Sequence, residues 1–255
     1  MHELLEGVIH AVHEAGATVM RVYGREFAVR GKADASPVTD ADEAAEALIV
    51  AALQRLAPAV PVVAEEAVAA GRCPALAPRF WLVDPLDGTK EFVQRNGEFT
   101  VNVALVEQGV PVLGVVLAPA LARLYAGVHG QGAFAEQGGV RQPIRCRSVP
   151  PEGWTVVASR SHGDEQALAA FLRGARVAEL RHVGSSLKLC LLAEGRADVY
   201  PRLGPTMAWD IAAGHAVLLA AGGRVTELDG RPLSYARADF RNPQFVACGA
   251  TPWRA

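Results

Sequence analysis

Two aspartates lie three residues apart in the run Asp84-Pro85-Leu86-Asp87-Gly88-Thr89, directly after the apolar stretch Phe80 to Val83. The apolar stretch is typical of a short buried strand, which we expect Pro85 to end because proline fixes φ and lacks an N–H donor. Two carboxylates this close repel each other unless one is protonated or cations lie between them. Because Mg²⁺ prefers oxygen ligands, the run predicts a magnesium site. The alternative is an ordinary Asx-turn, since Asp-Gly pairs are common in loops.

The residues beside the two aspartates extend this chemistry. The carbonyl of Leu86 could be a further metal ligand, and Gly88 permits a tight turn with a close approach of the backbone to a ligand. Gly88 and Thr89 could also open a helical turn whose free N–H groups face a phosphate. The run therefore predicts a place where metal ions and a phosphate group meet.

Two distant acids could join this site. Glu65 ends a predicted strand, as Asp84 does, and the ends of neighbouring strands can meet at one edge of a sheet. Its alternative is a solvated pair with Glu66. Asp210 follows Trp209 at the start of an apolar helix and could be a metal ligand from the second half of the chain. Its alternative is an acid that the helix dipole favours.

Asp42 and Thr89 could supply the remaining chemistry. A metal ion lowers the pKa of bound water and so provides a nucleophile at neutral pH, and two ions about 4 Å apart would stabilise the attacking and leaving oxygens. Thr89 could donate its hydroxyl to Asp42 and accept a proton from the water. The alternative for Asp42 is a capping box with Thr39, three residues earlier. We expect that one carboxylate cannot easily fill both roles.

Hydrophobic periodicity predicts the elements that must position these residues. After the Asp84 run the period changes from helical to alternating, which indicates an antiparallel meander, and residues 67–78 are expected to form an irregular connection. A boundary near Val149-Pro150-Pro151 would separate residues 1–150, an α+β metal-binding domain, from residues 151–255, an α/β domain packed tightly across a cleft. We expect helices over residues 4–22, 39–57, 163–173, 185–193 and 209–221, and strands over residues 60–64, 80–83, 99–106, 112–118, 123–128, 132–135, 155–159, 176–180, 197–200, 224–227 and 244–248.

Size and composition exclude several classes of protein. The chain has 255 residues, a net charge of −2 and 51% hydrophobic residues, which is typical of one large or two small globular domains. A nucleic-acid surface usually carries a basic patch, so we expect no nucleic-acid partner. We also expect no secretory signal and no integral membrane segment, because no apolar run is long enough to cross a bilayer. The four cysteines form no Cys-x-x-Cys pair, which favours a reduced cytoplasmic protein without a zinc site.

Together these motifs resemble the lithium-sensitive, magnesium-dependent phosphatase superfamily that contains inositol monophosphatase. The shared pieces are Glu65-Glu66, the run Asp84 to Thr89, and Trp209-Asp210. Further pieces are similar to the bacterial 3′(2′),5′-bisphosphate nucleotidase branch, and the resemblance runs from the first helix to about Phe245. These pieces are Ser36-Pro37-Val38-Thr39, Lys90-Glu91-Phe92, Asn96 to Asn102, Ser159-Arg160-Ser161-His162, Gly184 to Lys188, and Tyr200 to Thr206.

The resemblance implies a fold and a set of site residues. The fold would be a layered α-β-α-β-α sandwich, with an antiparallel sheet and helices in the N-terminal part and a mixed α/β C-terminal part that completes the nucleotide site. Glu65 would also belong to the catalytic set, and Asp84 would bridge two of two or three Mg²⁺ ions. The implied metal ligands are Glu65, Asp84, Asp87, Asp210 and the Leu86 carbonyl, and the implied phosphate-holding N–H groups are those of Gly88 and Thr89.

The resemblance also implies that Thr89, paired with Asp42, orients the attacking water. Asp40 falls inside the same short motif, so the base could be either aspartate. Positions that contact the nucleotide in this family correspond to His162, Ser185, Lys188 and Arg202. Lysine and arginine suit a second phosphate, and serine and histidine are short polar partners. The alternatives are surface charges for the two cations and helix caps for the serine and the histidine. Glu98 is expected to order the active-site loop.

The implied activity is removal of the 3′-phosphate from adenosine 3′,5′-bisphosphate, giving AMP and phosphate, with the sulfated form of that nucleotide as a second substrate. One alternative keeps the chemistry and changes the substrate to inositol monophosphate or a sugar phosphate. A further alternative is a non-catalytic protein that senses the nucleotide or the metal. The resemblance also implies inhibition by Li⁺ in the millimolar range, a monomer or homodimer, and a cytoplasmic location that could include the inner face of the membrane.

Overall fold

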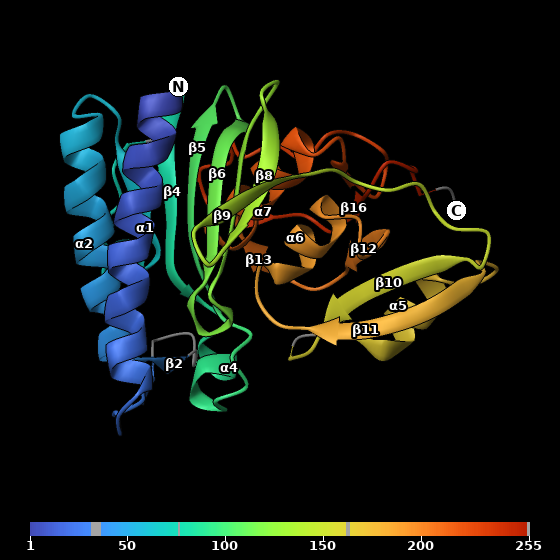
Figure 1. Cartoon of the computed structure of the whole chain (residues 1–255), viewed down its shortest axis with the longest axis horizontal. Coiled ribbons are helices and arrows are strands. Elements are labelled where there is room, and N and C mark those ends of the chain that lie inside the picture. Colours follow the sequence, from blue (N-terminus) through green and yellow to red (C-terminus); the bar gives the residue numbers. More distant parts are fainter. Residues whose placement is uncertain (32–36, 76, 162–163, 254–255) are drawn as a thin grey trace.

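The computed structural model describes residues 1–31, 37–75, 77–161 and 164–253. Figure 1 shows the elements stacked in layers from the N-terminal helices α1 and α2, through a first sheet, to the helices α6 and α7, then a second sheet, and finally α5. This is the α-β-α-β-α sandwich that the resemblance implied. In the described part of the chain, no helix has both the length and the apolar character needed to cross a bilayer.

The helices have the following bounds: α1 His2–Tyr23, α2 Asp40–Leu56, α3 Glu65–Ala69, α4 Thr89–Val93, α5 Glu165–Phe171, α6 Leu187–Ala193 and α7 Ala208–Ala220, with a 3₁₀ turn at Pro119–Leu121. The strands are β1 Arg30–Gly31, β2 Pro37–Val38, β3 Val62–Ala64, β4 Arg79–Asp87, β5 Thr100–Glu107, β6 Val110–Ala118, β7 Arg123–Val128, β8 Gly132–Gln137, β9 Val140–Ile144, β10 Trp154–Ser159, β11 Val177–Val183, β12 Val199–Arg202, β13 Thr206–Met207, β14 Arg224–Glu227, β15 Arg241–Asn242 and β16 Phe245–Cys248.

The first sheet has the strand order β3-β4-β5-β6-β7-β8-β9 and forms the predicted antiparallel meander from β4 onward. Within this sheet, as far as the structure describes it, only the pair β3–β4 is parallel. One face of the sheet packs on α1 and α2, and the cluster includes Val12, Ile49, Trp81 and Val103. Side chains alternate between the two faces of the sheet, and both faces are buried. These strands are therefore apolar almost throughout.

The second sheet has the strand order β11-β10-β12-β16-β14. Its pairs β10–β11 and β10–β12 are parallel, and β12–β16 and β14–β16 are antiparallel, which confirms the mixed α/β prediction for the C-terminal part. Its outer face packs Val156 and Val199 against Phe171 at the end of α5. The strand β10 ends at Ser159, so the residues after it lie at the edge where the pocket described below opens.

The main core crosses the predicted boundary near residue 150. One cluster joins Phe80 and Val116 of the first sheet to Leu189 of α6, Val217 of α7 and Phe245 of β16. The helix α7 lies so close to the first sheet that a Cβ atom at Gly114 of β6 would be 2.2 Å from the carbonyl oxygen of Ala213. Only glycine fits there, and the two halves are held face to face; their division into domains stays a prediction.

Several predicted boundaries were wrong for local reasons. Pro85 does not end its strand, because β4 continues to Asp87 with a register irregularity between Asp84 and Asp87. Residues 67–78 are not wholly irregular, since α3 begins at Glu65 directly after β3. The hairpin strand β9 was missed, although Gly138 and Gly139 both have positive φ, as a tight hairpin turn requires. The short ribbons β1–β2 and β13–β15 were also missed.

Candidate active site

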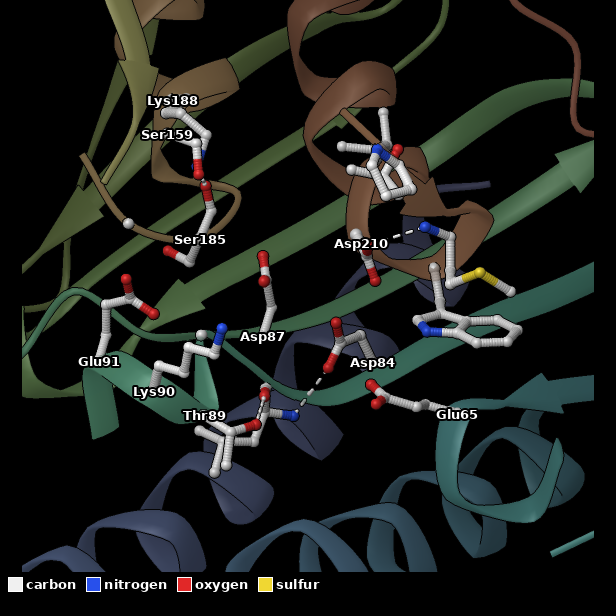
Figure 2. Close-up of a pocket in the computed structure, with 18 of the residues that line it drawn as sticks. Glu65, Asp84, Asp87, Thr89, Lys90, Glu91, Ser159, Ser185, Lys188 and Asp210 are labelled. Carbon is white, nitrogen blue, oxygen red and sulfur yellow. Dashed lines mark hydrogen bonds between the residues drawn. The ribbon is translucent and has the colours of Figure 1, made fainter. Parts of the chain in front are cut away.

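Four carboxylates from three elements line one pocket of about 430 Å³. Glu65 is the first residue of α3, Asp84 and Asp87 lie at the end of the strand β4, and Asp210 lies in the first turn of α7. Figure 2 shows these side chains facing a common space, with Asp87 and Asp210 above Asp84 and Glu65. The predicted convergence of acids from separate parts of the chain on one pocket is therefore observed.

Three of these acids are oriented by backbone N–H groups. The Leu86 N–H donates to Asp84 Oδ1 at 3.0 Å, the Ser186 N–H to Asp87 Oδ2 at 2.6 Å, and the Met207 N–H to Asp210 Oδ2 at 2.8 Å. Within the described residues, the other carboxylate oxygen of each accepts no hydrogen bond. Asp210 thus lies in the first turn of its helix, where the helix dipole favours an acid, and still presents one oxygen as a possible ligand.

Burial and mutual repulsion raise the pKa of these acids. Burial and the nearby charges of Glu65, Asp87 and Asp210 hold the pKa of Asp84 well above its usual range. Burial likewise raises the pKa of Asp210, with Asp87 and Glu65 adding to it. For Asp87, burial raises the pKa to about 6, although Lys188 opposes the shift. Buried carboxylates that repel one another are stable as anions only beside cations, so the donor set fits hard divalent ions.

The acids line the pocket walls and do not form a closed cage. Among the residues that the structure describes, no three His, Cys, Asp or Glu side chains gather as tightly as a metal-ligand cluster does. The Leu86 carbonyl and the backbone of Gly88 lie on the same wall. Gly88 has a φ of 86°, a left-handed conformation that favours glycine, and it places the first turn of α4 beside the acids.

Asp42 makes both of the contacts that we expected to exclude each other. Its Oδ2 accepts from the N–H and the hydroxyl of Thr39, at 2.8 Å each, which is the predicted capping box. Its Oδ1 lies 3.5 Å from the hydroxyl of Thr89, which is also 3.2 Å from the Leu86 carbonyl. Because the two oxygens of one carboxylate point in different directions, the expectation of a conflict was wrong. Burial raises the pKa of Asp42 to about 7, and the Thr39 bonds oppose this shift.

The geometry separates Asp42 from Asp40. The side chain of Asp40 is 66% exposed and pairs with Arg30 at 3.1 Å, on the outside of the helix start. Asp42 is buried behind Thr89. Of the two aspartates in the motif, Asp42 is the one in contact with the pocket residue Thr89.

The opposite wall carries two buried cations. Lys188 is 5% exposed and donates from Nζ to the carbonyls of Val183 at 3.2 Å and Ser185 at 2.5 Å. Arg202 is 7% exposed and donates to the Pro205 carbonyl at 2.7 Å. Neither is the surface charge that the alternative required. Burial lowers the pKa of Lys188 to about 8, with Asp87 opposing the shift and Arg202 adding to it.

The structure places Ser185 before the helix that was predicted to begin with it. It lies on the pocket wall with a φ of 47°, and α6 begins only at Leu187, after Ser186 at the N-cap position. The predicted helix start at Ser185 was therefore wrong, because a left-handed residue cannot belong to the first helical turn. His162 lies outside the described residues, and Asp164 caps α5 by accepting from the Ala167 N–H.

A model of the "Inositol monophosphatase family" matches residues 1–251 of the chain. The chain belongs to the inositol monophosphatase family. Metal dependence is general to this family. A relative within it, the "3′(2′),5′-bisphosphate nucleotidase CysQ" of Salmonella typhimurium, is 48% identical over 95% of this chain and 98% of its own length.

Solved structures of the inositol monophosphatase family share the fold. The crystal structure of CysQ from Bacteroides thetaiotaomicron has a TM-score of 0.82 and 38% identity, covering 97% of each chain. The inositol monophosphatase from Anabaena has a TM-score of 0.78 and 27% identity, covering 98% of this chain and 92% of its own. The shared fold accounts for the layers seen in Figure 1.

Some pocket residues had no predicted role. Lys90 and Glu91 were recognised only as part of a motif, although both line the pocket beside Asp87 (Figure 2). Arg241 lines the same pocket from β15 and had no local signal at all. A helix as short as α4 gives no periodicity, so the burial of Glu91 could not be read from spacing. Glu98 lies beside the site and accepts from the Gly184 N–H at 2.8 Å.

Proposed function

We propose that this chain is a Mg²⁺-dependent 3′(2′),5′-bisphosphate nucleotidase. It removes the 3′-phosphate from adenosine 3′,5′-bisphosphate, giving AMP and phosphate, and also accepts the sulfated form of the nucleotide. The observation that carries the proposal is one pocket with converging carboxylates on one wall and two buried cations on the other. The nucleotidase relative at 48% identity supports the same substrate class.

In this proposal two or three Mg²⁺ ions would be held by the Leu86 carbonyl and by the carboxylates of Glu65, Asp84, Asp87 and Asp210. When bound, Mg²⁺ supplies charge neutralisation for the phosphate and lowers the pKa of a water molecule. The carboxylate oxygens left outside the backbone hydrogen bonds would be the ones available to bind the ions. The cytoplasmic location and a monomeric or homodimeric state belong to the same proposal.

The water is oriented by the chain itself. Thr89 accepts a proton of the water on its hydroxyl oxygen and donates its own proton to Asp42, which is 3.5 Å away. Asp42 suits this task because burial has brought its pKa to about 7, near the pH at which a base must both accept and release a proton. Glu65, at the start of α3, completes the catalytic set. The N–H groups of Gly88 and Thr89 hold the phosphate that is cleaved.

The second phosphate contacts the opposite wall. Lys188 and Arg202 supply positive charge in a desolvated setting, where a hydrogen bond to a phosphate is strong. Ser185 contributes a short polar contact beside them, and His162 belongs to the same proposed set. A doubly phosphorylated substrate would place a second anion beside Lys188 and Arg202, and an inositol or sugar monophosphate carries no such second anion.

The test is release of phosphate from adenosine 3′,5′-bisphosphate with Mg²⁺, beside inositol 1-phosphate and a sugar phosphate at equal concentration. We expect the highest kcat/KM for the bisphosphate. Higher activity on inositol phosphate would assign the rival substrate, as in the Anabaena relative. Tight nucleotide binding with no turnover would instead indicate a sensor.

A further inference from the structure

Glu91 is a buried carboxylate in the pocket that the proposed mechanism does not use. It lies on α4, two residues after Thr89, and is 3% exposed. Its Oε1 accepts a hydrogen bond from the hydroxyl of Ser161 at 2.6 Å. Ser161 follows β10 and so belongs to the second half of the chain. This bond therefore joins the phosphate-holding turn to the opposite wall.

Glu98 makes a second contact between the same two walls. Its carboxylate accepts from the Arg160 guanidinium at 3.0 Å and from the Gly184 N–H at 2.8 Å. Arg160 also donates to the His182 carbonyl at 2.8 Å, so it ties the end of β10 to the end of β11. Glu91 and Glu98 thus bind the neighbouring residues Ser161 and Arg160, which follow β10.

No free space separates these segments. A Cβ atom at Gly184 would lie 2.7 Å from both Glu91 Cγ and the Glu98 carbonyl oxygen. A Cβ atom at Gly88 would lie 3.2 Å from Glu91 Oε2 and 3.4 Å from the Cβ of Ser185. Figure 2 shows the Glu91 carboxylate on the Ser185 side of the pocket, away from Asp210 and Glu65. Glu91 thus packs between the Gly88 turn, which is proposed to hold the cleaved phosphate, and the Gly184 loop that leads to α6.

The position of Lys188 depends on the same loop. Its ammonium group donates to the carbonyls of Val183 and Ser185, which flank Gly184. A shift of the loop would therefore move the Lys188 charge relative to the four pocket acids. Ser185 itself is held in a left-handed conformation, so it depends on the surrounding contacts to stay in place.

We propose that Glu91 is a positioning residue that sets the distance between the two phosphate subsites. Through Ser161 and the Gly184 loop it fixes Ser185 and Lys188 over the Gly88 turn, so that only a substrate with two correctly spaced phosphates engages both walls. This inference rests on the proposed nucleotidase function and names what makes that function selective. It assigns Glu91 no contact with the reacting atoms.

The test compares kcat/KM for adenosine 3′,5′-bisphosphate with kcat/KM for adenosine 3′-monophosphate, which lacks the second phosphate. We expect the ratio of the two to fall about tenfold in Glu91→Ala, the effect of losing one hydrogen bond to a charged group. Glu91→Gln removes the same charge but keeps an acceptor for Ser161, so its ratio should stay within about twofold of wild type. Ser161→Ala, in a partly exposed position, should lower the ratio as Glu91→Ala does, and the double variant should fall no further.

Each outcome decides a separate point. A wild-type ratio near one would overturn the proposed nucleotidase function and this inference with it. A high wild-type ratio that Glu91→Ala and Ser161→Ala leave unchanged would overturn the inference alone. Equal losses in Glu91→Ala and Glu91→Gln would overturn positioning through the Ser161 hydrogen bond, since the loss would then follow the charge alone. If Glu91→Ala does not fold, Ser161→Ala and Glu91→Gln still give the comparison.

Discussion

The two walls of the pocket carry opposite charges and are built in opposite ways. The acidic wall comes from the end of β4 plus two helix starts, and backbone N–H groups orient three of its carboxylates. The basic wall comes from the loop before α6 and the end of β12, and its cations are held by main-chain carbonyls. We therefore expect the acidic wall to determine whether the reaction occurs. We expect the basic wall to determine which substrate undergoes it.

The largest expected effect is on the acidic wall. Asp84→Asn should lower kcat/KM by on the order of a thousandfold for every phosphate substrate, because it removes a carboxylate that would hold the proposed ions. Thermal unfolding with and without Mg²⁺ is the second measurement. We expect Mg²⁺ to raise the Tm of wild type and not of the variant. Equal activity in the two proteins would end the metal-site proposal.

A second pair of substitutions tests which of the two aspartates after Thr39, Asp40 or Asp42, is the base. Asp42→Asn should lower kcat by about a hundredfold, the usual contribution of a general base. Asp40→Asn is the matched control and should stay within about twofold of wild type, because an exposed ion pair contributes little. If the control lost as much activity as Asp42→Asn, the assignment of the base would be reversed.

The basic wall should respond selectively. Lys188→Met keeps much of the buried volume and removes the charge. We expect kcat/KM for adenosine 3′,5′-bisphosphate to fall between about ten- and a hundredfold, as for loss of a charged hydrogen bond. Activity on adenosine 3′-monophosphate should change far less. Parallel losses on both substrates would mean that the two walls do not divide the work as proposed.

The smallest expected effect is a pH dependence of substrate choice. Because burial lowers the pKa of Lys188 to about 8, the ammonium is charged below that pH and is lost as the pH rises through it. The bisphosphate-to-monophosphate ratio of kcat/KM should therefore fall as the pH rises above that point, and the total fall should not exceed the loss in Lys188→Met. Lys188→Arg does not titrate in this range, so its ratio should stay level from pH 7 to 9. A flat wild-type ratio would contradict a role for this lysine.

The acidic wall was largely predictable from the sequence, and the basic wall was less so. The turn from Asp84 to Thr89 is local, and its chemistry follows from residue types a few positions apart. Asp42 was misjudged only in that its two oxygens can serve two partners at once. On the other wall, the left-handed Ser185 and the delayed start of α6 depend on packing against Glu91 and Glu98, which lie more than 80 positions earlier. No local pattern carries such a contact.

The fold shows the same division. Long periodic elements such as α2 and the meander from β5 to β8 were predicted close to their observed bounds. Errors fall where tertiary pairing overrides local preference, as at Pro85, which a register irregularity keeps within β4. The core shared by both halves was expected only as tight packing, because its partners lie far apart in the sequence.

Because Gly114 can carry no side chain, we expect some inactivating substitutions to lie far from the pocket. An added methyl group there would press on the main chain of α7 and lift the helix that carries Asp210. A survey of inactivating substitutions should therefore include changes of Gly114, in the middle of β6 beneath the helix, although this position lies outside the pocket.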